Sequence, residues 1–150
     1  MTIETPFGHV HAAVNAEGAL TELKFGPAGL GNGNGTADAA VGRQLREYFA
    51  GERKAFDLPL APDGTEFQKR VWAELRRIPY GETISYAELA RRVGSEDASR
   101  AVGRANGANP IAIVVPCHRV IGADGSLTGY AYGVELKRRL LDFETGQTRL

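Results

Sequence analysis

The sequence predicts an α+β fold in two parts, a small N-terminal α+β domain and a mostly helical C-terminal domain. Three observations support this prediction. Two alternating segments near the N-terminus indicate a β-hairpin, residues 57–64 have the composition of a linker, and helix-start signals recur after residue 64. The expected boundaries are residues 1–56 for the first domain, 57–64 for the linker and 65–150 for the second domain.

The N-terminal domain is predicted from alternation and from turn residues. Residues 9–14 and 20–25 alternate apolar and polar side chains, and residues 15–18 between them are a hairpin signal. Residues 26–35 are rich in glycine but lack the Lys-Ser/Thr pair of a phosphate-binding loop, so we interpret them as a solvated loop. Residues 38–50 have the apolar spacing of an amphipathic helix.

The C-terminal domain carries two helix-start signals. Residues 65–68 form a capping box before a helix that we expect to reach about residue 77, and residues 85–88 repeat the pattern before a shorter helix. A second short helix is predicted over residues 98–106. Two short helices joined by a glycine-containing turn are typical of the helix-turn-helix, which many proteins place against DNA.

A single cysteine, Cys117, follows an aliphatic run in this second domain. Residues 111–115 predict a buried strand that leads to Cys117 and His118, and residues 134–144 predict a closing helix. A thiol becomes nucleophilic near neutral pH only when a base or a positive field lowers its pKa. Adjacent residues of a strand point to opposite faces, so His118 would reach the sulfur only through a water molecule or a turn. A lone cysteine is also a common structural residue, so both interpretations stay open.

The composition sets limits on function. The 18 basic and 18 acidic residues cancel, but residues 98–120 hold Arg100, Arg104 and Arg119 and no acid, a local basic surface that suits a phosphate backbone. A solvated helix face would explain such arginines equally well. One cysteine excludes an internal disulfide and indicates a reducing cytoplasm, and we recognise no signal peptide and no membrane-spanning run. The three histidines lack ligand spacing, so we expect no metal.

Taken in order, short motifs between residues 56 and 146 resemble the O6-alkylguanine-DNA alkyltransferase family, the methylated-DNA–protein-cysteine methyltransferases. The motifs are Gly64-Thr65-x-Phe67-Gln68-x-x-Val71-Trp72, Ile78-Pro79-Tyr80-Gly81-Glu82-Thr83-x-Ser85-Tyr86, Arg100-Ala101-Val102-Gly103, Asn109-Pro110, Pro116-Cys117-His118-Arg119-Val120 and Thr128-Gly129-Tyr130-Ala131. The resemblance implies a ribonuclease-H-like N-terminal domain and a cytoplasmic repair protein that transfers one alkyl group to Cys117 and thereby inactivates itself.

The resemblance also implies a role for each matching catalytic residue. Cys117 is the alkyl acceptor, His118 is the base that acts through a water molecule, and Glu144 orients His118. Asn109 braces the turn before the cysteine segment. Tyr86 helps to rotate the nucleotide out of the duplex and offers a proton to guanine N3.

DNA recognition is implied in the same way. An O6-alkyl group inside a duplex is out of reach of a side chain, so the base is flipped out from the minor-groove side while Arg100 fills the gap. The expected DNA contacts are Arg100, Ala101, Gly103, Arg104, Tyr86 and Arg119, and the expected pocket residues are Val115, Val120, Tyr130, Ala131 and Tyr132. We expect a monomer on double-stranded DNA, with no cofactor and no membrane association.

Tyr132 departs from the family pattern, because it stands where family members commonly have glycine. A large ring beside the pocket predicts poor tolerance of bulky O6 groups such as benzyl. It also leaves open a second function, a non-catalytic lesion binder of the alkyltransferase-like kind, although such proteins lack the cysteine. A cysteine hydrolase, the third alternative, would need an oxyanion hole and a distant histidine, and it leaves the helix-turn-helix unexplained.

Overall fold

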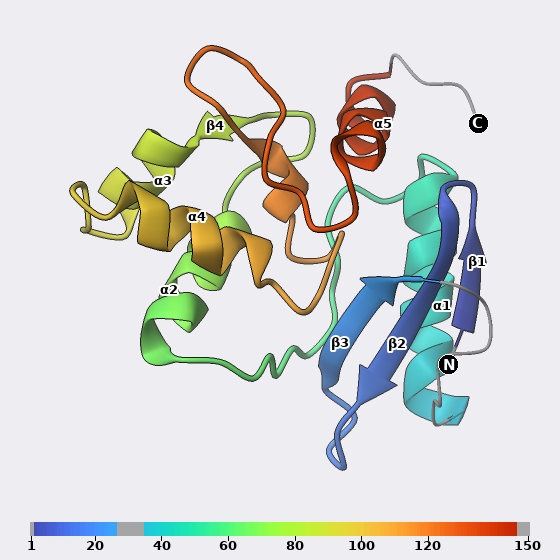
Figure 1. The fold of residues 1–150 in the computed structure, drawn as a ribbon. Coiled ribbons are helices and arrows are strands. Elements are labelled where there is room, and N and C mark those ends of the chain that lie inside the picture. The colour runs from blue at the N-terminus through green and yellow to red at the C-terminus, as the bar shows by residue number, and fades with distance from the viewer. Residues whose placement is uncertain (1, 27–34, 147–150) are drawn as a thin grey trace. The chain divides into compact units, whose positions relative to one another are not determined.

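The computed structural model describes residues 2–26 and 35–146, without the side chains of residues 35–38, and the predicted α+β class is confirmed. The chain divides into two compact units (Figure 1). The first comprises Met1–Asp63 and Pro110–Val114, and the second comprises Gly64–Asn109 and Val115–Leu150. Residues 110–114 therefore belong to the first unit, although the residues before and after them belong to the second. The chain returns to the second unit at Val115, two residues before Cys117.

The described residues of the first unit form a three-stranded antiparallel sheet and one helix (Figure 1). The sheet has the order β1-β2-β3, and the elements are β1 (Thr2–Thr5), β2 (Gly8–Val14), β3 (Leu20–Phe25) and α1 (Gly35–Phe49). The predicted hairpin is confirmed as β2 and β3, and Gly18 in its turn has a φ of 83° that favours glycine. The four-residue β1 was not predicted. Most of the predicted glycine-rich loop, residues 27–34, lies outside the described residues.

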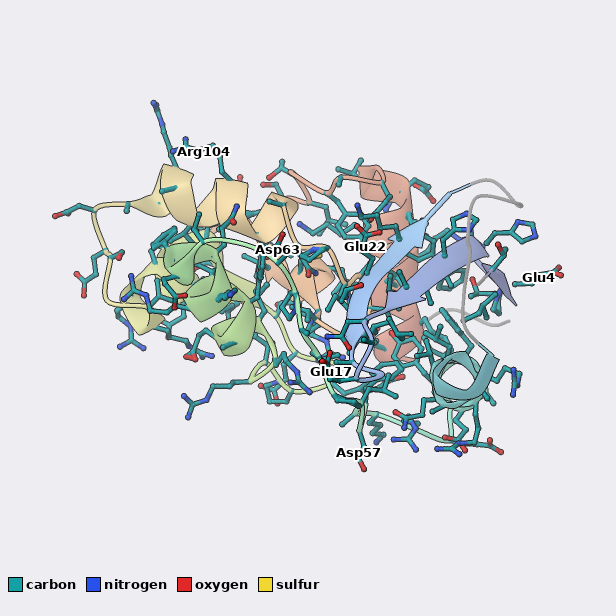
Figure 2. The ribbon with its side chains drawn as sticks, turned by 90° about the horizontal axis from the view of Figure 1, so that it is seen from below. Glu4, Glu17, Glu22, Asp57, Asp63 and Arg104 are labelled. Carbon is teal, nitrogen blue, oxygen red and sulfur yellow. The ribbon has the colours of Figure 1, made fainter. Side chains whose placement is uncertain are left out.

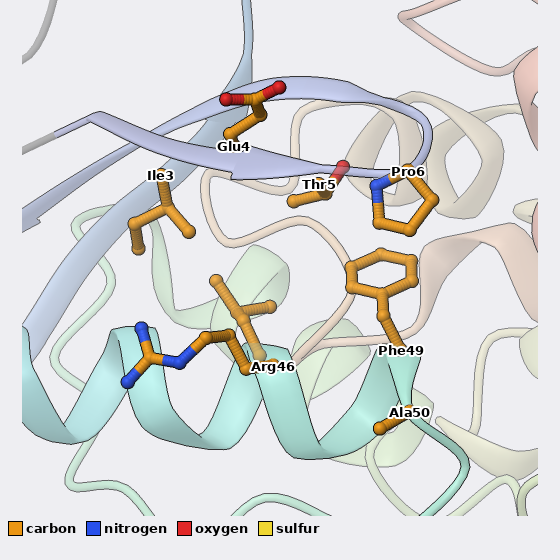
Figure 3. Close-up of a pocket in the computed structure, with 8 residues that line it drawn as sticks. Ile3, Glu4, Thr5, Pro6, Arg46, Phe49 and Ala50 are labelled. Carbon is orange, nitrogen blue, oxygen red and sulfur yellow. The ribbon is translucent and has the colours of Figure 1, made fainter.

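One face of the sheet and one face of α1 form the core of this unit. Val10 and Leu23 from neighbouring strands and Leu45 and Tyr48 from the helix are fully buried. Each buried side chain of this kind contributes roughly 1.5–3 kcal/mol to folding. A cavity of about 280 Å³ remains beside them, between β1 and α1 (Figure 3). Its lining holds neither a thiol nor an imidazole and consists of Ile3, Glu4, Thr5, Pro6, Leu45, Arg46, Phe49 and Ala50.

The second unit is mostly helical, with one short parallel pair of strands. Its elements are α2 (Glu66–Leu75), β4 (Ile84–Ser85), α3 (Tyr86–Arg92), α4 (Ser99–Gly107), the 3₁₀-helix η1 (Cys117–Arg119), β5 (Val120–Ile121) and α5 (Val134–Glu144). The α5 bounds match the predicted closing helix, and α3 and α4 form the predicted pair of short helices. The pairing of β4 with β5 was not predicted, because strands of two residues carry no periodicity.

The two predicted capping boxes differ in the structure. At α2 the box is complete, since Thr65 Oγ1 accepts from Gln68 N at 3.1 Å and Gln68 Oε1 accepts from Thr65 N at 3.0 Å. At α3 only the first half is formed: Ser85 Oγ accepts from the Glu88 amide, whereas the Glu88 carboxylate pairs with two arginines, Arg91 and Arg92. Arginines one turn away therefore compete with the backbone for that carboxylate.

The predicted strand over residues 111–115 is wrong. Only Ile111 forms a bridge, to Leu23, and Ile113 has a φ of 71°, which β-branched residues rarely adopt. The Val114 amide donates to the Ala112 carbonyl at 2.7 Å, which closes a γ-turn around Ile113. An inverse γ-turn follows at Pro116, with φ −83° and ψ 66°. All five residues are buried, and an apolar run is compatible with any buried backbone conformation.

Candidate active site

Cys117 and His118 are the first two residues of η1, so their backbone is not the extended segment that was considered for them. Neighbours in a 3₁₀-helix are about 120° apart around the axis, so the two side chains do not point to opposite faces. Both are buried, with exposed fractions of 5% and 0%. Burial raises the pKa of the Cys117 thiol, against a hydrogen bond with the Asn109 side chain and the positive charge of Lys137. The resting thiol is therefore protonated at neutral pH and needs a base.

His118 is held by Glu144, across 26 residues of sequence. His118 Nε2 lies 2.9 Å from Glu144 Oε2 inside the unit. An ionised carboxylate can only accept a hydrogen bond, so Nε2 carries the proton and Nδ1 has a free lone pair. Nδ1 is buried and has no hydrogen-bond partner among the described residues. The ring is thus oriented at one nitrogen and able to take a proton at the other, which is the arrangement of a general base.

Arg119, expected at the DNA surface, is buried with an exposed fraction of 6%. Its guanidinium donates from Nε to Glu144 Oε1 and from Nη2 to Glu144 Oε2, both at 2.8 Å. A third bond runs from Nη1 to the Ile78 carbonyl at 2.7 Å, and the Tyr80 ring lies 5.7 Å from Arg119 Cζ. These donors face protein groups and not the surface on which Arg100 and Arg104 lie.

Glu144 is therefore a buried carboxylate in contact with the Arg119 guanidinium and the His118 imidazole. Burial alone would raise its pKa, but His118 and Arg119, by charge and by hydrogen bonds, hold the pKa of Glu144 well below its usual range. Glu144 is the last residue of α5, so that helix carries the carboxylate to the cysteine segment. The contact of Glu144 with His118 was expected from the sequence, but its contact with Arg119 was not.

Two asparagines hold the backbone around Cys117. Asn109 Nδ2 donates to the Val115 carbonyl at 2.8 Å, which supports the expected brace between the end of α4 and the cysteine segment. Asn106, which the sequence analysis did not single out, is 1% exposed and its Nδ2 lies 3.4 Å from the Cys117 carbonyl. Asn106 belongs to the last turn of α4, and Asn109 follows the end of that helix.

Tyr86 is linked to a buried lysine that the sequence analysis missed. Tyr86 OH donates to the Thr128 carbonyl at 2.9 Å, and Lys137 Nζ donates to the same carbonyl at 2.8 Å and lies 3.5 Å from Tyr86 OH. Burial lowers the pKa of Lys137 to about 8, against the influence of Cys117. A signal existed: Lys137 is one turn from Leu140 and two turns from Glu144, on the inward face of the predicted helix.

The expected DNA contacts on α4 lie at its surface. Arg100 and Arg104 are exposed and four residues apart, on one side of the helix, and Figure 2 shows Arg104 extending away from α4. Neither arginine forms an ion pair with another described residue, unlike Arg91 and Arg92 on α3. Ala101 and Gly103 on the same helix are half-buried, and small side chains there permit a close approach to the helix backbone.

The expected pocket residues form two groups. Val115 and Val120, on either side of η1, are buried. Tyr130 is buried and its hydroxyl has no hydrogen-bond partner among the described residues, whereas Ala131 is exposed. The Tyr132 ring packs edge-on against Tyr130, with the ring centroids 5.5 Å apart. Tyr132 thus contacts the tyrosine that was expected to form the pocket wall.

The described part of the chain gives no sign of a metal centre or a membrane segment. Across residues 2–26 and 35–146, no three His, Cys, Asp or Glu side chains are grouped so that they could hold a metal ion. Within the same residues, no helix has both the length and the apolar character needed to cross a bilayer.

Comparison with known families matches both parts of the chain. Residues 66–146 match the family model described as 6-O-methylguanine DNA methyltransferase, DNA binding domain. Residues 1–62 match the model described as 6-O-methylguanine DNA methyltransferase, ribonuclease-like domain. All the site residues described above lie within the first of these matches.

Individual relatives and a solved structure agree with the family models. A methylated-DNA–protein-cysteine methyltransferase of Methanosarcina acetivorans is 65% identical over 102 residues, which are 68% of this chain and 65% of that protein. A protein of the same name from Mycolicibacterium paratuberculosis is 50% identical over 149 residues, which are 95% of this chain and 90% of that protein. The crystal structure of Mycobacterium tuberculosis OGT in complex with DNA is similar with a TM-score of 0.88 and 47% identity, over 97% of this chain and 92% of that one.

Proposed function

Because this chain belongs to the 6-O-methylguanine DNA methyltransferase family, we propose that it repairs DNA directly, by moving the alkyl group of an O6-alkylguanine onto Cys117. One observation carries the proposal: the residue after the buried thiol is a buried histidine whose Nε2 lies 2.9 Å from a buried carboxylate and whose Nδ1 has no partner among the described residues. A structural cysteine would have no need of such a base.

The transfer follows from this geometry. The Cys117 proton passes through a water molecule to His118 Nδ1, and Glu144 stabilises the imidazolium that forms. The thiolate attacks the alkyl carbon, a C–S bond forms, and the C–O6 bond breaks with its electron pair left on guanine. Tyr86 offers a proton to guanine N3 and offsets the negative charge that develops on the base. The products are an unmodified guanine and a thioether on Cys117.

Access to the alkyl carbon requires that the nucleotide leave the duplex, because Cys117 is buried and cannot enter a base stack. Arg100, exposed on α4, fills the gap in the stack while Arg104 binds the backbone. Small residues of α4, Ala101 and Gly103, let the helix approach the minor groove closely. We further propose that the protein acts as a monomer on double-stranded DNA in the cytoplasm.

The proposal is tested by incubating the protein with a duplex that carries one O6-methylguanine and locating the added mass by peptide mapping. We expect the mass of one methylene group on the peptide that holds Cys117, and no more than one such addition per protein, because thiols do not reverse a thioether. Tight binding without any mass change would reject alkyl transfer and favour the non-catalytic lesion binder, with Tyr132 as the block.

Arg100→Ala is expected to slow repair of the duplex lesion by about 10- to 100-fold, because the cost of unstacking a base, a few kcal/mol, is no longer offset. The reaction of Cys117 with free O6-methylguanine should keep its rate, since a free base needs no flipping. Arg104→Ala is the matched control. Loss of one phosphate contact weakens binding to all DNA sequences and lowers the slope of log K against log salt concentration by about one. Equal rate losses in the two variants would contradict the assigned role of Arg100.

Tyr132→Gly is expected to raise the rate of inactivation by O6-benzylguanine by about tenfold, the lower end of the roughly 10- to 200-fold range by which one methylene group changes reactivity in an apolar pocket. Inactivation by O6-methylguanine should change little, because a methyl group is small enough to fit beside the ring. The measurement is residual repair activity after incubation with each free base. If the wild-type protein already reacts equally fast with both bases, Tyr132 does not restrict the pocket.

A further inference from the structure

The Glu144 carboxylate is shared between His118 and Arg119. Arg119 approaches both oxygens, with Nε on Oε1 and Nη2 on Oε2 at 2.8 Å, while His118 Nε2 lies 2.9 Å from Oε2. None of the three side chains is accessible enough for water to replace these contacts, since their residues are 0–6% exposed. The carboxylate therefore has a permanent positive partner in addition to the imidazole.

Arg119 is also fixed in place by groups that do not titrate near neutral pH. Its Nη1 donates to the Ile78 carbonyl at 2.7 Å, and the Tyr80 ring stacks near its guanidinium. Burial raises the pKa of Tyr80 and of Tyr130, so both phenols remain neutral. Among the described residues, the groups with an electrostatic influence on or from Glu144 are His118, Arg119, Tyr80 and Tyr130. Cys117 precedes His118 in η1, and Lys137 of α5 acts on Cys117.

The sum of the buried charges around His118 determines whether its imidazole is protonated. With Arg119 present, the charges of the carboxylate and the guanidinium cancel, so the buried cluster needs no positive charge on the imidazole to be neutral. Without Arg119, the buried carboxylate would be uncompensated, and it would be neutralised most readily by a proton on His118. An imidazolium cannot accept the proton of Cys117.

We propose that Arg119 is a positioning residue of the alkyl transfer, which neutralises Glu144 so that His118 is oriented by the carboxylate but stays an uncharged base. The role rests on the proposed function, in which His118 takes the proton of Cys117. It also explains why an arginine follows the Cys-His pair directly: the next residue of the same turn reaches the carboxylate that orients the histidine.

The test combines a spectroscopic and a kinetic measurement on Arg119→Met, which keeps the aliphatic part of the side chain. In ¹⁵N-histidine NMR without DNA, we expect His118 to be a neutral Nε2–H tautomer at pH 7 in the wild type and an imidazolium in the variant. Alkyl transfer should be about tenfold slower at pH 7, with the acid limb of its rate profile about one pH unit higher. An imidazole that stays neutral in the variant, or an equal rate loss at every pH, would overturn the proposal.

Two further variants keep the proposal testable if Arg119→Met folds poorly. Arg119→Lys keeps the charge and should keep His118 neutral, and Arg119→Met/Glu144→Gln removes both charges and should return the acid limb to its wild-type position. A limb that stays displaced in the double variant would also overturn the proposal. Arg138→Met, on the exposed face of α5, is the matched control and should leave the His118 signals unchanged. The NMR result needs no DNA, so it remains decisive even if alkyl transfer itself is not observed.

Discussion

Cys117→Ser is expected to abolish alkyl transfer and to leave lesion binding intact. A serine hydroxyl is a far weaker nucleophile than a thiolate, and His118, acting through a water molecule, does not deprotonate it enough to compensate. The arginines proposed to bind DNA, Arg100 and Arg104, lie on α4 and are untouched by the change. The measurements are methyl transfer from a duplex with one O6-methylguanine, by mass, and the Kd for the same duplex.

Two controls make this result specific to the thiol. A buried hydroxyl without a partner costs about 1–3 kcal/mol, so the thermal unfolding of the variant must show that it is folded at the assay temperature. The Kd for the lesion duplex should stay close to that of the wild type. Methyl transfer by the serine variant, or a modified peptide other than the one with residue 117, would contradict Cys117 as the acceptor.

Glu144→Ala is expected to lower the free energy of unfolding by about 3–5 kcal/mol, the usual cost of removing one partner of a buried ion pair. The variant leaves the Arg119 guanidinium without its carboxylate and His118 without its orienting bond. Alkyl transfer should fall as well, because the imidazole is no longer held. Glu135→Ala is the matched control on the same helix, since the Glu135–Arg138 pair is exposed and its loss should leave the Tm close to that of the wild type.

The effect of Glu144→Ala is expected to depend on pH. The pKa of Glu144 is depressed in the folded protein, so the carboxylate stabilises the fold above the ordinary glutamate pKa of about 4.3. This contribution is lost as the pH falls below that value toward the lower pKa of the folded state. The stability difference between wild type and variant should therefore be largest near neutral pH and shrink in acid. A difference that is constant from neutral to acid pH would show that the carboxylate is not ionised in the fold.

Local patterns predicted most of the helices and the hairpin of this chain. The capping box at Thr65 and the apolar spacing of residues 134–144 gave helices at the expected places, and residues 15–18 gave the turn between β2 and β3. Each of these signals depends on side chains within a few residues of one another. The backbone can respond to them without any partner from elsewhere in the chain.

The cysteine segment shows where local patterns stop being sufficient. Residues 111–115 are as apolar as a buried strand, yet they contain a γ-turn at Ile113, because the surrounding packing, and not local preference, determines their backbone. β4 and β5 were missed for a related reason, since each is only two residues long and exists through its pairing with the other.

The amino-acid sequence by itself singled out the candidate site residues and the family motifs that they match, because Cys117, His118, Asn109 and Tyr86 stand in short ordered segments. Only the tertiary structure decided what their partners are. In the structure, Arg119, which was expected to contact DNA, is bound to Glu144, and Lys137 lies beside Tyr86. A charged residue in a sequence can face solvent, bind a phosphate group or pair with a buried group of opposite charge. The choice depends on desolvation and on groups that lie 25 and 51 residues away along the chain.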